Sequence, residues 1–275
     1  MKKDKKKIKK SPSNLLDIHR VTTKRSRNHF PHPSQNPAQS YLCTAPNSKT
    51  SQIQSDPARM SSEKELEELS RPEYWDARYA AKSAGAGGKD MKSFEWFRDF
   101  RKLKRFFEEW LPAPGGAEVL LHLGCGNSTL TSDLYHEGYK HQICVDFSQV
   151  VINAMVTKYA ELNQRWAVMD VRKLELEDSS IDLAIDKGTL DAFLHGSLWS
   201  PPDDVISNVG AYVDEVARVL KPEGKWLYIT YRQPHFMKPL LEREGEWSLE
   251  VQVLEDPDGA GGFEYFGFIM TKNIS

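Results

Sequence analysis

Three aspartates each close a short apolar run in this 275-residue chain: Asp146, Asp170 and Asp186. If the runs are parallel strands, their carboxyl ends meet at one edge of a sheet, where ligands bind in open α/β proteins. A carboxylate at that edge can accept hydrogen bonds from the hydroxyl groups of a ribose. Aspartate is also common at turns, but three such positions in succession indicate a binding edge.

A glycine turn precedes these aspartates. Residues 119–123 have the apolar composition of a buried strand and lead into Gly124 and Gly126, after which a helix begins near Thr129. Glycine lets the backbone approach a ligand closely, and a helix N-terminus offers free N–H groups and a partial positive charge. Asp146 stands 22 residues after Gly124, close to the separation of about 20 typical of ribose-binding acids. The spacing predicts a nucleotide-type cradle.

The elements that position these residues alternate between strand and helix. Two further apolar runs, 247–254 and 263–271, flank a Gly-rich stretch too short for a helix, which predicts an antiparallel hairpin. We therefore predict an α/β, Rossmann-like fold: a mainly parallel seven-stranded sheet with helices on both faces and a C-terminal antiparallel β-hairpin. The hairpin, and Thr129 in place of the third fingerprint glycine, disfavour a nicotinamide dehydrogenase. The helical patterns between the parallel strands span 130–137, 150–162 and 205–220.

The stretch before the sheet, 61–116, is predicted to be a helical lid. A short acidic helix spans 62–70, and Pro72 begins a second helix. In that second helix Trp75 and Tyr79 are four residues apart and share one face. This aromatic pair belongs either to the core or to a surface that packs on a bound ligand.

A third helix is predicted over 94–111, where Phe, Leu and Trp recur at helical spacing. Trp96 lies off that apolar stripe and is available for another role. Residues 117–275 then form the ligand-binding core.

Residues 1–60 are predicted to be a disordered basic tail, because Lys, Ser, Pro and Gln dominate and apolar residues are few. Such a tail serves nuclear localisation, binds a polyanion, or has no specific role. Met60 offers an alternative, since it directly precedes a capping box formed by Ser62 and Glu65. Met60 would then be the initiator of the native protein, and the tail an artefact of start-site choice.

Charge is unevenly distributed along the chain. Residues 1–59 hold 13 Lys and Arg against 3 Asp and Glu, whereas the remaining residues hold 24 against 36. An acidic body disfavours nucleic-acid binding by the folded part on electrostatic grounds and suits a basic partner.

Cysteine usage and hydropathy bear on the compartment. Cys43, Cys125 and Cys144 form no metal-binding or disulfide pattern, so no metal is predicted, and Cys125 reads as a small turn residue. No apolar run approaches the ~18 residues of a membrane span. We expect a cytoplasmic protein that does not enter membranes, with a nuclear location as the alternative if the tail is present. A monomer is favoured.

The predicted layout resembles the class I, seven-β-strand fold of S-adenosylmethionine-dependent methyltransferases over about residues 72–272. Five stretches narrow the resemblance to the elongation factor 1-alpha lysine methyltransferase 4 family and the N-terminal domain of methyltransferase-like 13 proteins. The stretches are YWDARY at 74–79, FEWF at 94–97, LGCGNS at 123–128, MDVRKL at 169–174 and DKGTLDA at 186–192. The last of these, DKGTLDA, is the most specific to the family.

The resemblance implies a cofactor, S-adenosyl-L-methionine, and its contacts. Asp146 would accept from the ribose hydroxyls and Phe147 would lie against the adenine, while the helix end after Gly126 would face the methionine carboxylate. Lys187 would act through its backbone or by neutralising nearby acids. Gly126 is added as the second glycine of the cradle. The contacts that the resemblance implies are Trp75, Tyr79, Trp96, Gly124, Asp146, Phe147, Asp170, Val171 and Lys187.

The resemblance further implies a protein substrate, elongation factor 1-alpha, methylated on lysine. At pH 7 an attacking lysine must lose its proton at a cost of ~4–5 kcal/mol, which partial desolvation reduces. Asp186 and Asp191 are therefore the catalytic candidates, placed at the mouth of the site to attract and orient the amine. Asp191 has an alternative role as a helix cap.

Other acceptors remain as alternatives. A small molecule would use the same cofactor half of the fold, and a catalytically silent binding module would keep it without turnover. Amino-methylating nucleic-acid enzymes usually carry an Asn/Asp-Pro-Pro-Tyr-like motif after the fourth strand, and here residues 186–189 read DKGT. The substrate class thus rests on the resemblance, because a fold alone does not fix it.

Overall fold

The computed structural model describes residues 63–84, 91–259 and 264–274. The predicted tail 1–60, the alternative start at Met60 and the cap Ser62 lie outside the described residues. The division between lid and core at residue 116 also stays a prediction.

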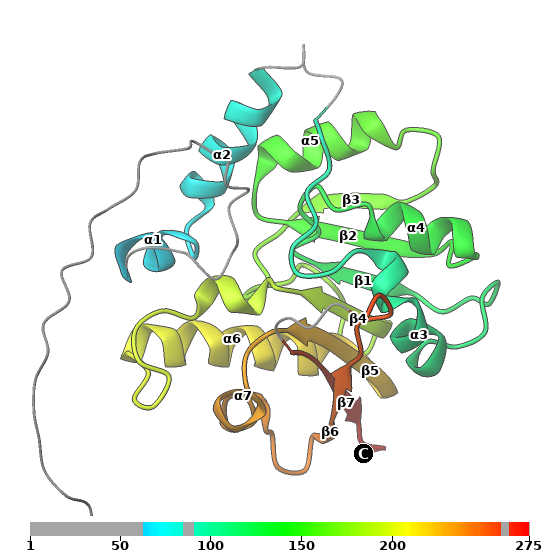
Figure 1. Ribbon diagram of the computed structural model, residues 1–275. Helices are drawn as coiled ribbons and strands as arrows, with labels where there is room; N and C mark the ends of the chain where they lie inside the picture. Colours follow the sequence, from blue (N-terminus) through cyan, green and yellow to red (C-terminus); the bar gives the residue numbers. More distant parts are fainter. Residues whose placement is uncertain (1–62, 85–90, 260–263, 275) are drawn as a thin grey trace, which may run out of the picture. The chain divides into compact units, whose positions relative to one another are not determined.

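A seven-stranded sheet organises the described part of the chain, in the order β3-β2-β1-β4-β5-β7-β6 (Figure 1). Strands β1 to β5 pair in parallel, and β7 runs antiparallel to both β5 and β6. The predicted fold class is confirmed. The strands are β1 (Leu120–Leu123), β2 (Gln142–Asp146), β3 (Arg165–Val168), β4 (Ile181–Lys187), β5 (Leu220–Thr230), β6 (Trp247–Leu254) and β7 (Tyr265–Lys272).

Strand register brings the predicted aspartates to one edge. Leu123, the last residue of β1, pairs with Val145 on one side and with Asp186 on the other. Asp146 pairs with Val168 at the end of β3. The carboxyl ends of β1 to β4 are therefore level, as the parallel arrangement requires.

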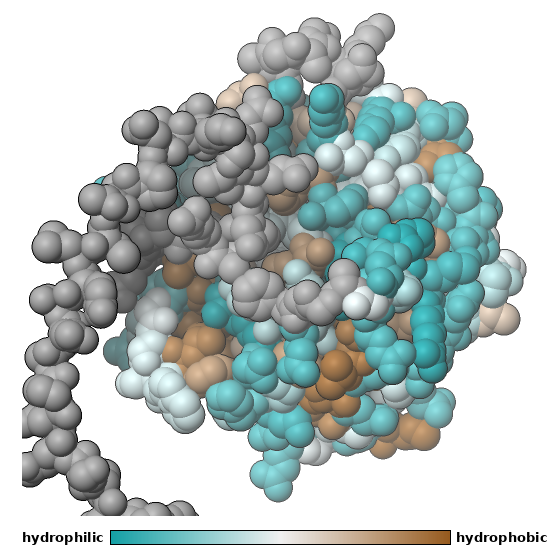
Figure 2. All heavy atoms as spheres, viewed as in Figure 1, coloured by the Kyte–Doolittle hydropathy of each residue, from teal (hydrophilic) through white to brown (hydrophobic). Residues whose placement is uncertain are grey.

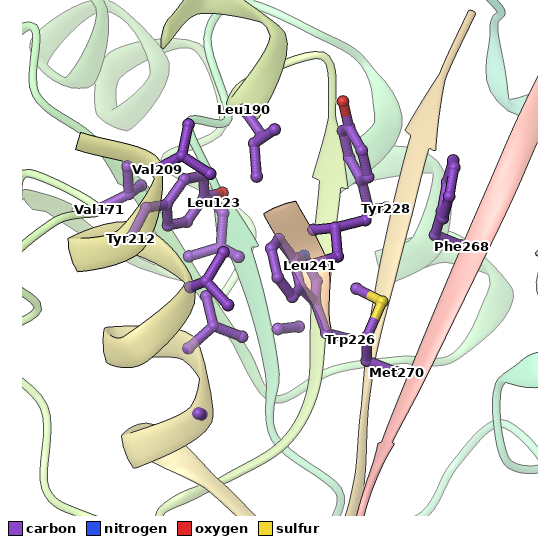
Figure 3. Close-up of a cluster of buried hydrophobic side chains, with 14 of the residues drawn as sticks. Leu123, Val171, Leu190, Val209, Tyr212, Trp226, Tyr228, Leu241, Phe268 and Met270 are labelled. Carbon is purple, nitrogen blue, oxygen red and sulfur yellow. The ribbon is translucent and has the colours of Figure 1, made fainter. Parts of the chain in front are cut away.

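Helices cover both faces of the sheet (Figure 1). α6 (Asp203–Val219) and α7 (Pro234–Leu241) pack on one face, and α3 (Phe100–Trp110) and α4 (Leu130–Glu137) pack on the other. Each helix buries one apolar stripe, which is the main source of its stability. In Figure 3, Val209 and Tyr212 of α6 point toward the cluster that holds Leu123, Tyr228 and Trp226 of the sheet.

Local sequence sets several helix ends as predicted. Ser148 caps α5 (Gln149–Lys158) by accepting a hydrogen bond from the backbone N of Val151 at 3.3 Å. Gly138 ends α4 in the left-handed conformation, at φ 114°, which glycine adopts without steric cost.

The helix predicted over 94–111 is shorter in the structure. It begins only at Phe100, because the carboxylate of Asp99 accepts from the backbone N of Lys102 and caps the first turn. Phe97 has φ 62°, a left-handed conformation that a right-handed helix excludes. Phe94 and Trp96 therefore lie in an irregular segment, 91–99, instead of on a helix.

Two elements differ from expectation. Where the alternative role of Asp191 implied a helix, a single 3-10 turn, η2 (Leu190–Phe193), follows β4, and α7, which follows β5, was not predicted. Pro239 lies inside α7, and an internal proline is a strong signal against a helix.

The N-terminal described elements are α1 (Glu63–Glu68) and α2 (Pro72–Ala84), and α2 packs on α5. Within the described ranges, no helix is long and apolar enough to cross a membrane.

The surface seen in Figure 2, from the same side as Figure 1, is mainly hydrophilic where grey atoms do not cover it, with apolar patches between the hydrophilic residues.

Candidate active site

A pocket opens at the carboxyl edge of the sheet and contains about 850 Å³ of empty space, part of it open to solvent. Its walls come from α2, the segment around Trp96, the turns after β1 and β2, and the loop after β4. Asp170, Asp186 and Asp191 are not part of this lining among the described residues. The predicted residues that do line it are Trp75, Tyr79, Trp96, Gly124, Gly126, Asp146, Phe147, Val171 and Lys187.

The glycine turn forms the floor of the pocket. Gly124 and Gly126 have φ 62° and 52°, in the left-handed region that disfavours other residues. A Cβ on Gly124 would lie 2.3 Å from the hydroxyl oxygen of Thr189, and one on Gly126 would lie 2.9 Å from that of Tyr79. Glycine is therefore required at both positions, and the backbone lies open to a ligand.

Asp146 is a buried carboxylate at the end of β2. Its oxygens accept hydrogen bonds from the backbone N of Gly126 at 3.0 Å and of Ser148 at 2.9 Å. Burial raises the pKa of Asp146 to about 6, although these two bonds oppose the rise. A carboxylate can accept about four hydrogen bonds, so capacity remains for ligand hydroxyls. Phe147 follows it, half-buried.

Aromatic rings form the wall opposite the sheet. The ring of Trp75 lies 5.8 Å from Tyr79 and 6.1 Å from Trp96, and Phe94 lies 4.9 Å from Trp96. The guanidinium of Arg78 stands between 5.2 and 5.6 Å from the rings of Trp75, Phe94 and Trp96. Helix α2 thus contributes both apolar surface and a positive charge near the pocket, a role of Arg78 that the sequence interpretation missed.

The ammonium group of Lys187 is bound by groups of the protein itself. Its Nζ lies 2.5 Å from Oε2 of Glu95 and donates to the backbone oxygens of Trp96 and Arg98 at 3.1 and 3.0 Å. Burial lowers the pKa of Lys187, and the charge of Glu95 opposes the change. The side chain therefore fastens segment 91–99 to the end of β4.

The N-terminus of α4 already has an acidic partner in the structure. Glu95 accepts from the backbone N of Thr129 at 2.6 Å and from the hydroxyl of Ser128 at 2.7 Å. A carboxylate at this position satisfies a free N–H group and complements the helix dipole. Glu95 therefore occupies the end of the helix that we expected to face a ligand carboxylate.

Asp170 pairs with a neighbour instead of facing the pocket. Its carboxylate accepts from Nη2 of Arg172 at 2.6 Å and from the backbone N of Arg172 at 2.9 Å. Burial raises the pKa of Asp170, but the bonds to Arg172 outweigh it and the pKa is lowered. The pocket meets this turn through Met169 and Val171, so a ligand contact from Asp170 itself stays a prediction.

Asp186 is fully buried and does not stand at a pocket mouth. It accepts from the backbone N of Thr189 and Leu190 at 2.7 and 3.0 Å and from the hydroxyl of Tyr212 at 2.7 Å. Burial raises its pKa to about 7, against the lowering effect of Tyr212. Asp186 thus holds the turn after β4.

Asp191 also lies below the surface, 8% exposed. It accepts from the hydroxyls of Tyr228 and Thr230, both at 2.8 Å, and from Nε of Arg232 at 3.0 Å. The alternative role as a helix cap is not seen, because Asp191 lies inside η2 and the hydrogen bonds of its carboxylate go to residues 228–232. A catalytic role for either carboxylate stays a prediction.

The sequence interpretation missed two polar residues of the pocket, His122 and Thr131. Both are buried, and neither His122 Nε2 nor Thr131 Oγ1 has a hydrogen-bond partner among the described residues. Burial lowers the pKa of His122 to about 4, so the ring is neutral at physiological pH. A histidine inside an otherwise apolar strand was the available signal.

The amino-acid sequence of the chain matches a known protein family. Residues 121–228 match the family model described as a methyltransferase domain. The chain is 35% identical over 204 residues to EEF1A lysine methyltransferase 4 of Mus musculus, an alignment that covers 73% of this chain and 74% of the mouse protein. It is 32% identical over 222 residues to the eEF1A lysine and N-terminal methyltransferase of Homo sapiens, covering 76% of this chain and 30% of that protein.

Solved structures agree at the level of the fold. A phosphoethanolamine N-methyltransferase 2 of Haemonchus contortus, in complex with S-adenosylhomocysteine, has a TM-score of 0.51 at 16% identity, covering 79% of this chain and 61% of that one. A structure described by the conversion of a disulfide bond into a thioacetal group during echinomycin biosynthesis has a TM-score of 0.52 at 14% identity, covering 74% of this chain and 93% of that one. The family model and the sequence relatives identify the chain as an S-adenosylmethionine-dependent methyltransferase that belongs to the EEF1A lysine methyltransferase 4 family.

Proposed function

We propose that this chain transfers a methyl group from S-adenosylmethionine to a lysine of translation elongation factor 1-alpha. The observation that carries the proposal is the 35% identity to the mouse EEF1A lysine methyltransferase 4 over about three quarters of both chains. The acidic balance of residues 60–275 supports it, because the acceptor side chain is cationic.

The pocket fits the adenosyl cofactor that the family implies. Gly124 and Gly126 expose backbone in the lining of the pocket, Asp146 presents a carboxylate suited to ribose hydroxyls, and Phe147 offers a ring face for adenine. The buried nitrogen of His122 and hydroxyl of Thr131 offer further hydrogen-bonding groups in the lining. When bound, the cofactor supplies an electrophilic methyl group on a sulfonium centre.

The chain's own residues then contribute position and environment. Trp75, Tyr79 and Trp96 exclude water from the pocket and offer rings that attract a positive charge by ~0.5–2 kcal/mol each. A lysine amine that enters this partly desolvated site has a lowered pKa, which makes the neutral, nucleophilic form easier to reach. In this proposal Asp186 and Asp191 position the loops after β4 and β5, and the lysine releases its proton to solvent water before it accepts the methyl group. Catalysis is mainly orientation of the two reactants.

The test uses the purified full chain, tritiated S-adenosylmethionine and a cytosolic extract freed of small molecules and nucleic acid. We expect one labelled band at the mass of elongation factor 1-alpha, which mass spectrometry then assigns to a lysine. Asp146→Ala abolishes the label, whereas Asp214→Ala, an exposed aspartate on α6, preserves it. Cofactor binding without any labelled protein would contradict the proposal and point to a small-molecule acceptor or a silent module.

Three further properties complete the proposal: a cytoplasmic location, a monomeric state, and no nucleic-acid binding by the folded part. The acidic balance of residues 60–275 supports the last of these.

A further inference from the structure

An exposed tryptophan stands on the loop between η2 and α6. Trp199 is 81% exposed, the largest exposed fraction of any large apolar side chain among the described residues. Its ring lies 5.7 Å from the ring of His235 and 4.9 Å from that of Phe236, at the start of α7. We call these three residues the Trp199 patch. A solvated tryptophan packed against other aromatic rings is a feature of binding surfaces.

The patch lies on the same edge of the sheet as the pocket. The loop that carries Trp199 continues from η2, whose Ala192 and Phe193 line the pocket. His235 and Phe236 follow the end of β5, the strand that pairs in parallel with β4. Both loops therefore leave the carboxyl ends of adjacent strands, and α6 lies beside α7 (Figure 1).

The two loops are fastened to each other beneath the patch. Arg232 donates from Nε to Asp191 at 3.0 Å and from Nη2 to the backbone oxygen of Leu194 at 3.2 Å. Arg232 and Asp191 are 13% and 8% exposed, so solvent competes little for this contact. A platform that is held in place before binding loses less entropy when a partner docks.

Acidic residues adjoin the aromatic surface. Asp203 and Asp204 are exposed in the first turn of α6, four and five residues after Trp199. Asp204 contacts His195 at 2.9 Å. Aromatic rings next to exposed carboxylates suit a basic peptide segment, because the rings attract Lys and Arg side chains and the carboxylates pair with them. The same carboxylates would repel a phosphate backbone.

We propose that the Trp199 patch, with Asp203 and Asp204, is the docking surface for a basic segment of the protein substrate that flanks the acceptor lysine. This inference rests on the proposed function and adds the surface by which the substrate is recognised. The patch holds the substrate outside the cofactor pocket, so its loss affects protein binding and leaves cofactor binding intact.

The test measures steady-state methylation of elongation factor 1-alpha and, by calorimetry, the Kd for S-adenosylhomocysteine. For Trp199→Ala we expect KM for the protein to rise at least about fivefold, with kcat and the S-adenosylhomocysteine Kd within twofold of wild type, since hot-spot truncations exceed 1 kcal/mol. The matched control is Val253→Ala on β6, an exposed apolar residue (53%) outside the two loops, and its KM stays at the wild-type value.

A second variant tests the charge. The double substitution Asp203→Asn with Asp204→Asn raises KM at low ionic strength, and the difference from wild type shrinks as salt is added, because exposed charges are screened. Substrate labelling with an unchanged KM in Trp199→Ala overturns the inference and leaves the proposed function standing. Absence of any labelled protein with the wild-type chain overturns both.

Discussion

Lys187 and Glu95 form an ion pair, 2.5 Å from Nζ to Oε2, that joins the end of β4 to the segment entering α3. Their side chains are 6% and 21% exposed. The pair connects two otherwise separate walls of the pocket, because Glu95 also contacts the start of α4 and Lys187 also contacts the backbone of Trp96.

We expect Lys187→Met to lower the free energy of unfolding by about 3 kcal/mol, since it leaves the largely buried carboxylate of Glu95 without its cationic partner. The affinity for S-adenosylhomocysteine should fall with it, as Trp96 loses its anchor. Urea unfolding and calorimetry measure the two effects. Lys104→Met is the matched control, because the Lys104–Glu137 pair is exposed, at 41% and 42%, and is worth ~1 kcal/mol or less. Equal destabilisation by both variants would contradict the role of the pair.

We expect Asp146 to make cofactor binding depend on pH. Its folded pKa, about 6, lies above the usual value near 3.9, so its carboxylate is the ionised acceptor only above about pH 6. We expect the affinity for S-adenosylhomocysteine to fall about tenfold between pH 7 and pH 5, as the proton removes the charged acceptor. The stability of the fold changes in the opposite direction. It increases as the pH falls through 6, because protonation of Asp146 relieves the cost of burying its charge. Calorimetry between pH 5 and pH 7 on wild type and Asp146→Asn tests this expectation. The variant should bind S-adenosylhomocysteine weakly, with an affinity that does not change near pH 6.

The substitution Asp191→Asn distinguishes two roles of this carboxylate: holding Arg232 and the loops in position, or taking part in methyl transfer directly. Loss of the charge leaves Arg232 without its buried partner, so we expect lower stability by about 3 kcal/mol and a raised KM for the protein. The S-adenosylhomocysteine Kd should stay within twofold of wild type, because Asp191 does not line the pocket. A hundredfold fall in kcat with unchanged KM and stability would instead assign Asp191 to the reaction itself.

The glycine turn can be tested by a pair of substitutions with opposite expected signs. Gly124→Ala places a Cβ 2.3 Å from Thr189 Oγ1 at φ 62°, and we expect a loss of at least about 2 kcal/mol from strain and overpacking. Gly210→Ala lies within α6 with no atom within 4 Å of the new Cβ, and we expect a gain of up to about 1 kcal/mol from helix propensity. Thermal unfolding of both variants checks the signs, and a stable Gly124→Ala would show that the turn tolerates a side chain.

Much of the pocket could be predicted because its parts are local in sequence. The strand before Gly124, the two glycines and Asp146 lie within one βαβ unit, where apolar runs and turn residues are informative on their own. The error over 94–99 has a distant cause. Phe94 and Phe97 repeat at helical spacing, yet Phe97 adopts a left-handed φ where its ring packs on Gly188, Tyr231 and Tyr265. Tertiary packing here overrode the pattern.

The sequence by itself determined the alternation of the parallel strands with helices, the terminal hairpin, the glycine turn and the place of Asp146 at the end of its strand. Hydrophobic periodicity and glycine stereochemistry act between near neighbours and are readable along the chain. Only the tertiary structure decided the partners of the charged groups: Lys187 with Glu95, 92 residues apart, and Asp191 with Arg232, 41 residues apart. A carboxylate or ammonium group carries no local signal of its partner, because burial and proximity arise only when distant segments meet.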